Sequence, residues 1–147
     1  MINPFDDAYF MKQAFHEARQ AYELGEVPVG AVVVAHNKII ARAHNLTEQL
    51  TDVTAHAEIL AITAAAIALG SKYLHGCTLY VTLEPCCMCA GALYWAQIDK
   101  IVYASRDEKR GSSKVNPSLF HPKTLLINGI MEEECTQLLK DFFSDKR

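Results

Sequence analysis

One histidine and two cysteines have the types and the spacing of a metal centre. His56 lies upstream of Cys86 and Cys89, which are separated by two residues and directly follow Pro85. Imidazole nitrogen and thiolate sulfur are the donors that zinc prefers. Three protein donors leave the fourth tetrahedral position open, whereas a structural zinc site is closed by four. The sequence therefore predicts one catalytic Zn2+ per subunit, held by His56, Cys86 and Cys89.

Glu58 stands two residues after His56 and is not needed as a ligand. A carboxylate beside a zinc-bound water can take its proton and later pass protons to a substrate. Zinc lowers the pKa of such a water from ~15.7 to roughly 7, which makes hydroxide available for attack on an electron-poor ring carbon. Glu58 is the predicted catalytic acid and base, and the predicted reaction is hydrolytic deamination.

A Cys-x-x-Cys pair alone is weak evidence, because core thiols and redox pairs also produce it. The combination of His-x-Glu with a later Pro-Cys-x-x-Cys is far more specific. A non-catalytic zinc or redox module stays open as an alternative. Glu58 argues against it, since a structural site needs a fourth protein ligand and no acid beside the metal.

The elements that must position these residues follow from periodicity and from helix and strand punctuation. Four helices are expected: Asp6–Leu24, Ala55–Leu69 with Thr54 as its cap, Cys86–Gln97, and a C-terminal helix whose inner stripe is Cys135, Leu138, Leu139 and Phe142. Five strands are expected at Gly30–Ala35, Ile39–Ala43, Thr78–Leu83, Lys100–Ala104 and Thr124–Ile127, with a loop over Gly111–Pro122. The pattern predicts a helix-covered mixed sheet.

This arrangement brings two helix starts together at one metal ion. Cys86 and Cys89 are three positions apart, so at a helix start they share one face. The positive end of the helix dipole favours both thiolates there. His56 lies at the beginning of another predicted helix.

Composition and charge restrict the class of protein. The 147 residues are 50% hydrophobic and 21% charged, which suits one soluble domain spanning 1–147. The longest nearly apolar stretch, Ile59–Leu69, is too short to cross a membrane. Met1–Asp7 has two acids and no base and so resembles no export or transit signal, which predicts a cytoplasmic protein with reduced cysteines.

Net charge is −3, but Lys100–Lys123 carries a local +4 that leaves −7 elsewhere. This distribution permits a polyanionic ligand near that segment. A solvated loop of mixed charges explains the same pattern.

The motifs resemble the zinc-dependent cytidine deaminase superfamily and, within it, the bacterial tRNA-specific adenosine deaminases. The resemblance runs from about Tyr9 to Phe143 and is carried by Gly25–Ala31, Asn45, Thr54–Glu58, Leu79–Cys86 and Cys89–Ala92. It implies a three-layer α/β/α sandwich with a mixed five-stranded sheet, and a homodimer. It also implies conversion of the wobble adenosine of a tRNA anticodon loop to inosine.

The resemblance also implies roles for single residues. His56, Cys86 and Cys89 match the zinc ligands and Glu58 matches the proton shuttle. Asn45 matches an asparagine that hydrogen-bonds the nucleoside, although a turn cap after the preceding strand explains it equally. The remaining substrate contacts implied are the backbone N–H of Ala57, the pocket wall at Val29, and Asp107 with its neighbours Arg106 and Lys109 against the RNA backbone.

Two features leave the substrate open. The run Ser112–Pro122 departs from the family pattern. Tyr94-Trp95-Ala96 is also similar to guanine deaminases, although Trp95 could simply be a large core aromatic. Deamination of a free base or nucleoside, of guanine or cytosine type, is therefore kept as an alternative. The other cysteines, Cys77, Cys135 and Cys87, are expected to pack as small apolar side chains.

Overall fold

The computed structural model describes residues 4–115 and 118–146. Within these residues, five strands form one mixed sheet in the order β2-β1-β3-β4-β5. β1 is antiparallel to β2 and β3, whereas β3, β4 and β5 run parallel. The strands are β1 Gly30–Ala35, β2 Lys38–His44, β3 Cys77–Leu83, β4 Lys100–Ser105 and β5 Leu125–Asn128.

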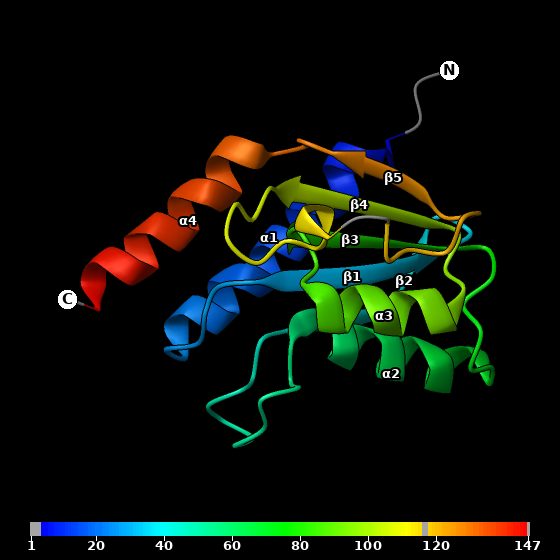
Figure 1. Ribbon diagram of the computed structural model, residues 1–147, viewed down its shortest axis with the longest axis horizontal. Helices are drawn as coiled ribbons and strands as arrows, with labels where there is room; N and C mark the ends of the chain where they lie inside the picture. The colour runs from blue at the N-terminus through cyan, green and yellow to red at the C-terminus, as the bar shows by residue number, and fades with distance from the viewer. Residues whose placement is uncertain (1–3, 116–117, 147) are drawn as a thin grey trace.

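The described part of the chain also forms four α-helices, which cover both faces of the sheet (Figure 1). α2 and α3 lie on one face, and α1 and α4 lie on the other. The helices are α1 Asp7–Glu23, α2 Ala57–Leu69, α3 Cys87–Ala96 and α4 Glu132–Asp145. The predicted three-layer α/β/α sandwich with a mixed five-stranded sheet is confirmed. Each element for which bounds were predicted lies within two residues of them, and α4 contains the predicted stripe of the C-terminal helix.

Two apolar cores separate the layers. β-branched residues of the central strands alternate between them: Val33 and Val81 pack under α2 and α3, while Val32 and Val102 pack under α1 and α4. Gly30 lets β1 touch α1, because a Cβ there would overlap the helix backbone. This close contact holds the beginning of β1 against α1.

α2 and α3 begin next to each other at one end of the sheet. Pro85 follows the end of β3 and α3 begins two residues later, which gives a strand-helix-strand crossover between the parallel strands β3 and β4. α2 ends at Gly70, whose φ of +66° suits glycine.

The structure corrects three sequence expectations. Trp95 is no core residue, since 75% of it is exposed on α3. Cys87 is exposed and does not pack behind the metal site, whereas Cys77 and Cys135 are buried as expected. Thr54 does not cap α2; its hydroxyl donates to Asp52, and the N-cap is His56.

The expected loop over Gly111–Pro122 contains one 3-10 turn, Ser112–Lys114. Residues 116 and 117 of this loop lie outside the described residues. None of the helices described is long and apolar enough to cross a membrane.

Candidate metal centre

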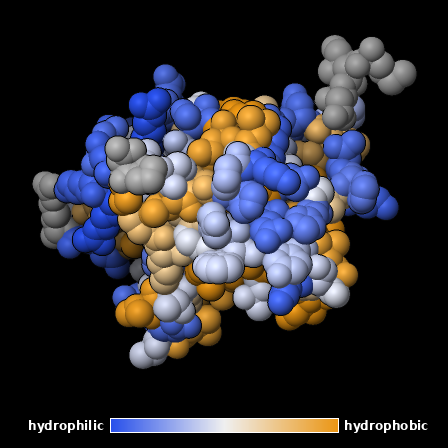
Figure 2. All heavy atoms as spheres, turned by 45° about the vertical axis from the view of Figure 1, so that its right-hand side comes forward, coloured by the Kyte–Doolittle hydropathy of each residue, from blue (hydrophilic) through white to orange (hydrophobic). Residues whose placement is uncertain are grey.

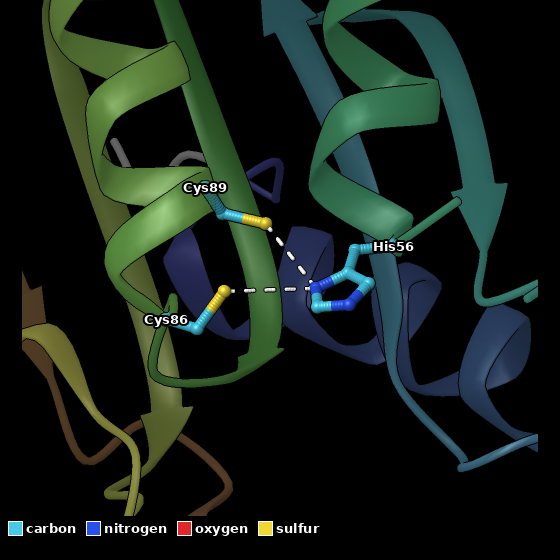
Figure 3. Close-up of side chains that lie close together, drawn as sticks. All are labelled: His56, Cys86 and Cys89. Carbon is cyan, nitrogen blue, oxygen red and sulfur yellow. Dashed lines mark hydrogen bonds between the residues drawn. The ribbon is translucent and has the colours of Figure 1, made fainter. Parts of the chain in front are cut away.

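The three predicted ligands meet where two helices begin. His56 is the N-cap residue of α2 and Cys86 is the N-cap residue of α3, while Cys89 lies in the first turn of α3. Neither cap residue uses its side chain to cap its own helix. The three side chains point toward one another from the two helix starts (Figure 3).

The spacing of the ligand atoms fits a tetrahedral zinc ion. The Nδ1 atom of His56 lies 3.6 Å from the Cys86 sulfur and 3.5 Å from the Cys89 sulfur. Zinc–nitrogen and zinc–sulfur bonds of usual length, at a tetrahedral angle, hold nitrogen and sulfur about 3.6 Å apart. Among the described residues this is the one group of three or more His, Cys, Asp or Glu side chains close enough to share a metal ion. Its donors are those of a zinc site, so zinc is the cofactor.

The electrostatics of the cluster favour a thiolate at Cys86. Hydrogen bonds from Cys89 and His56 lower the pKa of the Cys86 thiol to about 4. The same sharing of a proton, together with burial, raises the pKa of Cys89. A hydrogen bond to the Cys86 sulfur stabilises the protonated ring of His56 and raises its pKa. The protein alone thus holds one thiolate, and a bound dication favours the second.

Glu58 lies in the first turn of α2, and 4% of it is exposed. Burial raises the pKa of its carboxyl group to about 7, and the field of the Cys86 thiolate adds to the effect. A carboxyl group with a pKa near neutral pH can both accept and donate a proton. The structure therefore places a buried carboxyl group beside the metal ligands.

Asn45 is held at the edge of this centre by the start of α2. Its side-chain oxygen accepts a hydrogen bond of 2.7 Å from the backbone N–H of Ala57. Its own N–H donates to the carbonyl of Val29. Ala57 and Val29 are both buried in the apolar core between α2 and the sheet. Three of the residues expected to contact substrate thus form one connected group.

Asp107 lies apart from this group, on the loop after β4. Its carboxylate accepts the backbone N–H groups of Lys109 and Arg110 and so shapes the turn. The loop is joined directly to the metal centre, since Gly111 forms a β-bridge with the ligand residue Cys86.

A second buried carboxylate, Glu26, has a positional role that the sequence analysis missed. Glu26 is fully buried and accepts the backbone N–H groups of Glu48 and Gln49 at 3.1 and 2.8 Å. It thereby fixes the loop between β2 and α2, which carries His56 at its end. The sequence around Glu26, between Gly25 and Pro28, contains no pattern that predicts this contact.

Comparison with known proteins defines the class. The family model of the cytidine and deoxycytidylate deaminase zinc-binding region matches residues 5–105, which include all three ligand candidates and Glu58. The chain belongs to this family of zinc-dependent deaminases, which are hydrolytic enzymes.

The resemblance to the tRNA-specific adenosine deaminases within that family is confirmed. The tRNA-specific adenosine deaminase of Bacillus subtilis (strain 168) is 47% identical over 146 residues, which cover 96% of this chain and 91% of that protein. A solved structure from a study of A-to-I editing by tRNA:A34 deaminases at the wobble position of transfer RNA has a TM-score of 0.83 and 43% identity. The match covers 88% of this chain and 98% of that one.

A guanine deaminase is also similar. The X-ray structure of guanine deaminase from Bacillus subtilis is 39% identical with a TM-score of 0.65, over 71% of this chain and 66% of that chain. Both the coverage and the TM-score are lower than for the tRNA:A34 deaminase structure.

Proposed function

We propose that this protein converts adenosine to inosine at the wobble position of tRNA by hydrolytic deamination. The observation that carries the proposal is the buried acid Glu58 beside an open three-ligand zinc centre. The substrate follows from the relatives described above, which share nearly the whole chain.

The chemistry divides between the metal and Glu58. Zinc, when bound by His56, Cys86 and Cys89, activates water for attack near neutral pH. Glu58 takes a proton from the attacking water and delivers one to the purine ring nitrogen next to C6. The C6–N bond then breaks, the amino group leaves as ammonia with a second proton, and inosine remains. Adenosine and water are consumed in equal number, and no oxidant or reductant is required.

The substrate contacts are assigned by position. The Oδ1 atom of Asn45 is used by Ala57, which leaves the Nδ2 amide to donate to the nucleoside. Within the described residues no hydrogen bond takes that amide group. Val29 lies in the core below Ala57 and closes the base pocket from beneath. Asp107 shapes the basic turn that faces the RNA backbone.

The base must leave the stack before reaction, because C6 of a stacked adenine cannot be attacked. In a single-stranded anticodon loop, the base can turn outward at a small free-energy cost of unstacking. This favours a loop nucleotide over a paired one.

We also propose that the protein is a homodimer through the outer faces of α2 and α3. Ile67 of α2 and Trp95 of α3 are 77% and 75% exposed, and Met88 and Tyr94 of α3 are 37% and 38% exposed. Figure 2 shows hydrophobic residues along the lower edge of the molecule, the side on which α2 and α3 lie in Figure 1. An exposed apolar surface of this kind is typical of a subunit interface. We also propose that the protein is cytoplasmic, where a reducing environment keeps its cysteines as thiols.

The test uses an anticodon stem-loop RNA with adenosine at the wobble position. The zinc-loaded protein should release ammonia and form inosine at that nucleotide alone. A matched stem-loop with guanosine there should remain unchanged, as should free adenosine, guanine and cytosine. Turnover of free bases without turnover of the RNA would contradict the proposal.

Guanine is the second candidate substrate, because the guanine deaminase from Bacillus subtilis is 39% identical. The similarity of Tyr94-Trp95-Ala96 to guanine deaminases is not explained by packing in the core, since 75% of Trp95 is exposed. Conversion of guanine to xanthine in the same assay would favour this second function.

A further inference from the structure

A buried carboxylate lies under the loop that follows β4. Glu84 directly precedes Pro85 and Cys86, and 3% of it is exposed. None of the ion pairs found in residues 4–115 and 118–146 involves Glu84. Instead, its two oxygens accept the backbone N–H groups of Asp107 at 3.1 Å and Ser113 at 2.7 Å. A buried carboxylate needs such donors, so Glu84 and the loop fix each other.

The loop closes tightly around this carboxylate. Gly111 lies between the two donor residues, and a Cβ at this position would overlap the carboxylate of Glu84. Its backbone, with φ of −65° and ψ of 144°, is allowed for any residue. The absence of a Cβ at Gly111 therefore lets the loop approach the carboxylate as closely as it does, whereas its backbone conformation does not need glycine.

The same loop is bonded to the residues just before the metal ligand. The N–H of Ser112 donates to the carbonyl of Pro85 at 3.0 Å, and Gly111 pairs with Cys86. The residues 84–86 and 107–113 consequently form one hydrogen-bonded unit at the rim of the metal centre.

This unit presents positive charge to the solvent. Arg106, Lys109 and Arg110 are exposed, and none of them forms an ion pair with the residues that the structure describes. Lys114 differs, since it lies 3.4 Å from Glu108. Three unpaired cations beside the metal centre suit the phosphate backbone of a nucleic acid.

We propose that Glu84 is a positioning residue for the RNA. By fixing residues 106–113, it holds the three cations where they contact phosphates while the target base lies at the metal centre. This inference rests on the proposed function. Among the described residues, the side-chain hydrogen bonds of Glu84 go to the loop and not to His56, Cys86 or Cys89, so we expect Glu84 to act on substrate binding and not on the chemical step.

The test compares three variants of the zinc-loaded full chain. Glu84→Gln removes the charge, and Gly111→Ala keeps the charge but places a Cβ against the carboxylate, which must separate the carboxylate from the loop. Val34→Ala is the stability control, because Val34 is a buried residue opposite Thr78, at the other end of the sheet. The measurements are hydrogen exchange at the Asp107 and Ser113 amides, KM and kcat on the anticodon stem-loop RNA, and zinc content.

Glu84→Gln and Gly111→Ala should each raise exchange at the two amides by about tenfold or more. KM should rise by about tenfold as the cations lose their fixed position, and the dependence of KM on salt should weaken. The kcat and the zinc content should remain near those of the unmodified chain. Val34→Ala should lower the melting temperature without changing KM.

Two results separate the possible failures. Normal turnover of RNA by the unmodified chain, with unchanged KM in both loop variants or an equal KM rise in Val34→Ala, would overturn the role of Glu84 alone. Absence of RNA turnover by the unmodified chain would overturn the proposed function and this inference with it.

Discussion

The side-chain oxygen of Asn45 accepts the backbone N–H of Ala57 at 2.7 Å, which ties the end of β2 to the first turn of α2. That turn also carries the metal ligand His56 and the acid Glu58. His56 offers no side-chain cap to its helix, because its ring faces the two cysteines. Asn45 thus supplies from a distance the cap that a metal ligand at the N-cap position cannot provide.

Two substitutions of Asn45 separate its two roles. Asn45→Ala removes the acceptor and should lower the free energy of unfolding by about 1–2 kcal/mol, as loss of a helix cap does. Asn45→Asp keeps an acceptor for the Ala57 N–H and loses the amide donor, so it should retain most of the stability. Both substitutions should raise KM. Denaturant unfolding measures the stability, and steady-state kinetics on the stem-loop RNA measure KM. An unchanged KM in Asn45→Asp would reduce Asn45 to a structural cap.

Glu58→Gln should separate metal binding from turnover. Glutamine is nearly isosteric but cannot take or donate the required protons, so kcat should fall by about 10²- to 10⁴-fold. Zinc content should stay at one ion per chain, because Glu58 is not in the ligand group. Metal analysis and ammonia release on the same preparation check both. Loss of zinc in this variant would show that Glu58 serves the metal and not the chemistry.

Thiol labelling should report the metal centre directly. Of the five cysteines, Cys87 is exposed and should react first in the zinc-loaded chain. Chelation should then release Cys86, whose low thiol pKa makes it reactive at neutral pH. Cys135 should react only on unfolding, since it is buried and burial raises its pKa to about 12.

Mass spectrometry of the labelled chain identifies which cysteine has reacted at each stage. Fast labelling of Cys86 while zinc is bound would argue that its sulfur is not a ligand. Labelling of Cys135 in the folded chain would contradict the position of α4.

The proposed dimer surface can be tested with one charge. Trp95→Glu should give a monomer, because it buries an unpaired carboxylate in an apolar interface. Phe143→Glu is the matched control: Phe143 is 54% exposed on α4, on the other face of the sheet, and should leave the dimer intact. Sedimentation or light scattering of the zinc-loaded chain gives the mass. A monomeric unmodified chain would exclude the interface.

Much of the fold could be predicted because its signals are local. The run of Val residues in Gly30–Ala35 and the breaks at Pro85 and Gly70 each indicate an element or its end. The metal centre could also be predicted, since the sequence indicates that helices begin near His56 and Cys86. That Cys86 and His56 should converge across the fold came from the chemistry of zinc.

The missed features depend on contacts between distant segments. Glu26 and Glu84 read as ordinary charged residues beside turns, yet each is buried because another loop directs its N–H groups at the carboxylate. No period or spacing in the sequence contains that information. Trp95 was ambiguous for the opposite reason, because a helix with apolar residues all round predicts burial without saying whether a core or a partner covers it.

The central claim is an open zinc centre with three protein ligands, and X-ray absorption at the zinc edge of the loaded chain tests it most directly. We predict two sulfur ligands at about 2.3 Å, one imidazole nitrogen at about 2.0–2.1 Å and one further light atom that is not supplied by the protein. Three or four sulfur ligands, or a second imidazole, would contradict the account, because the position required for water would then be closed.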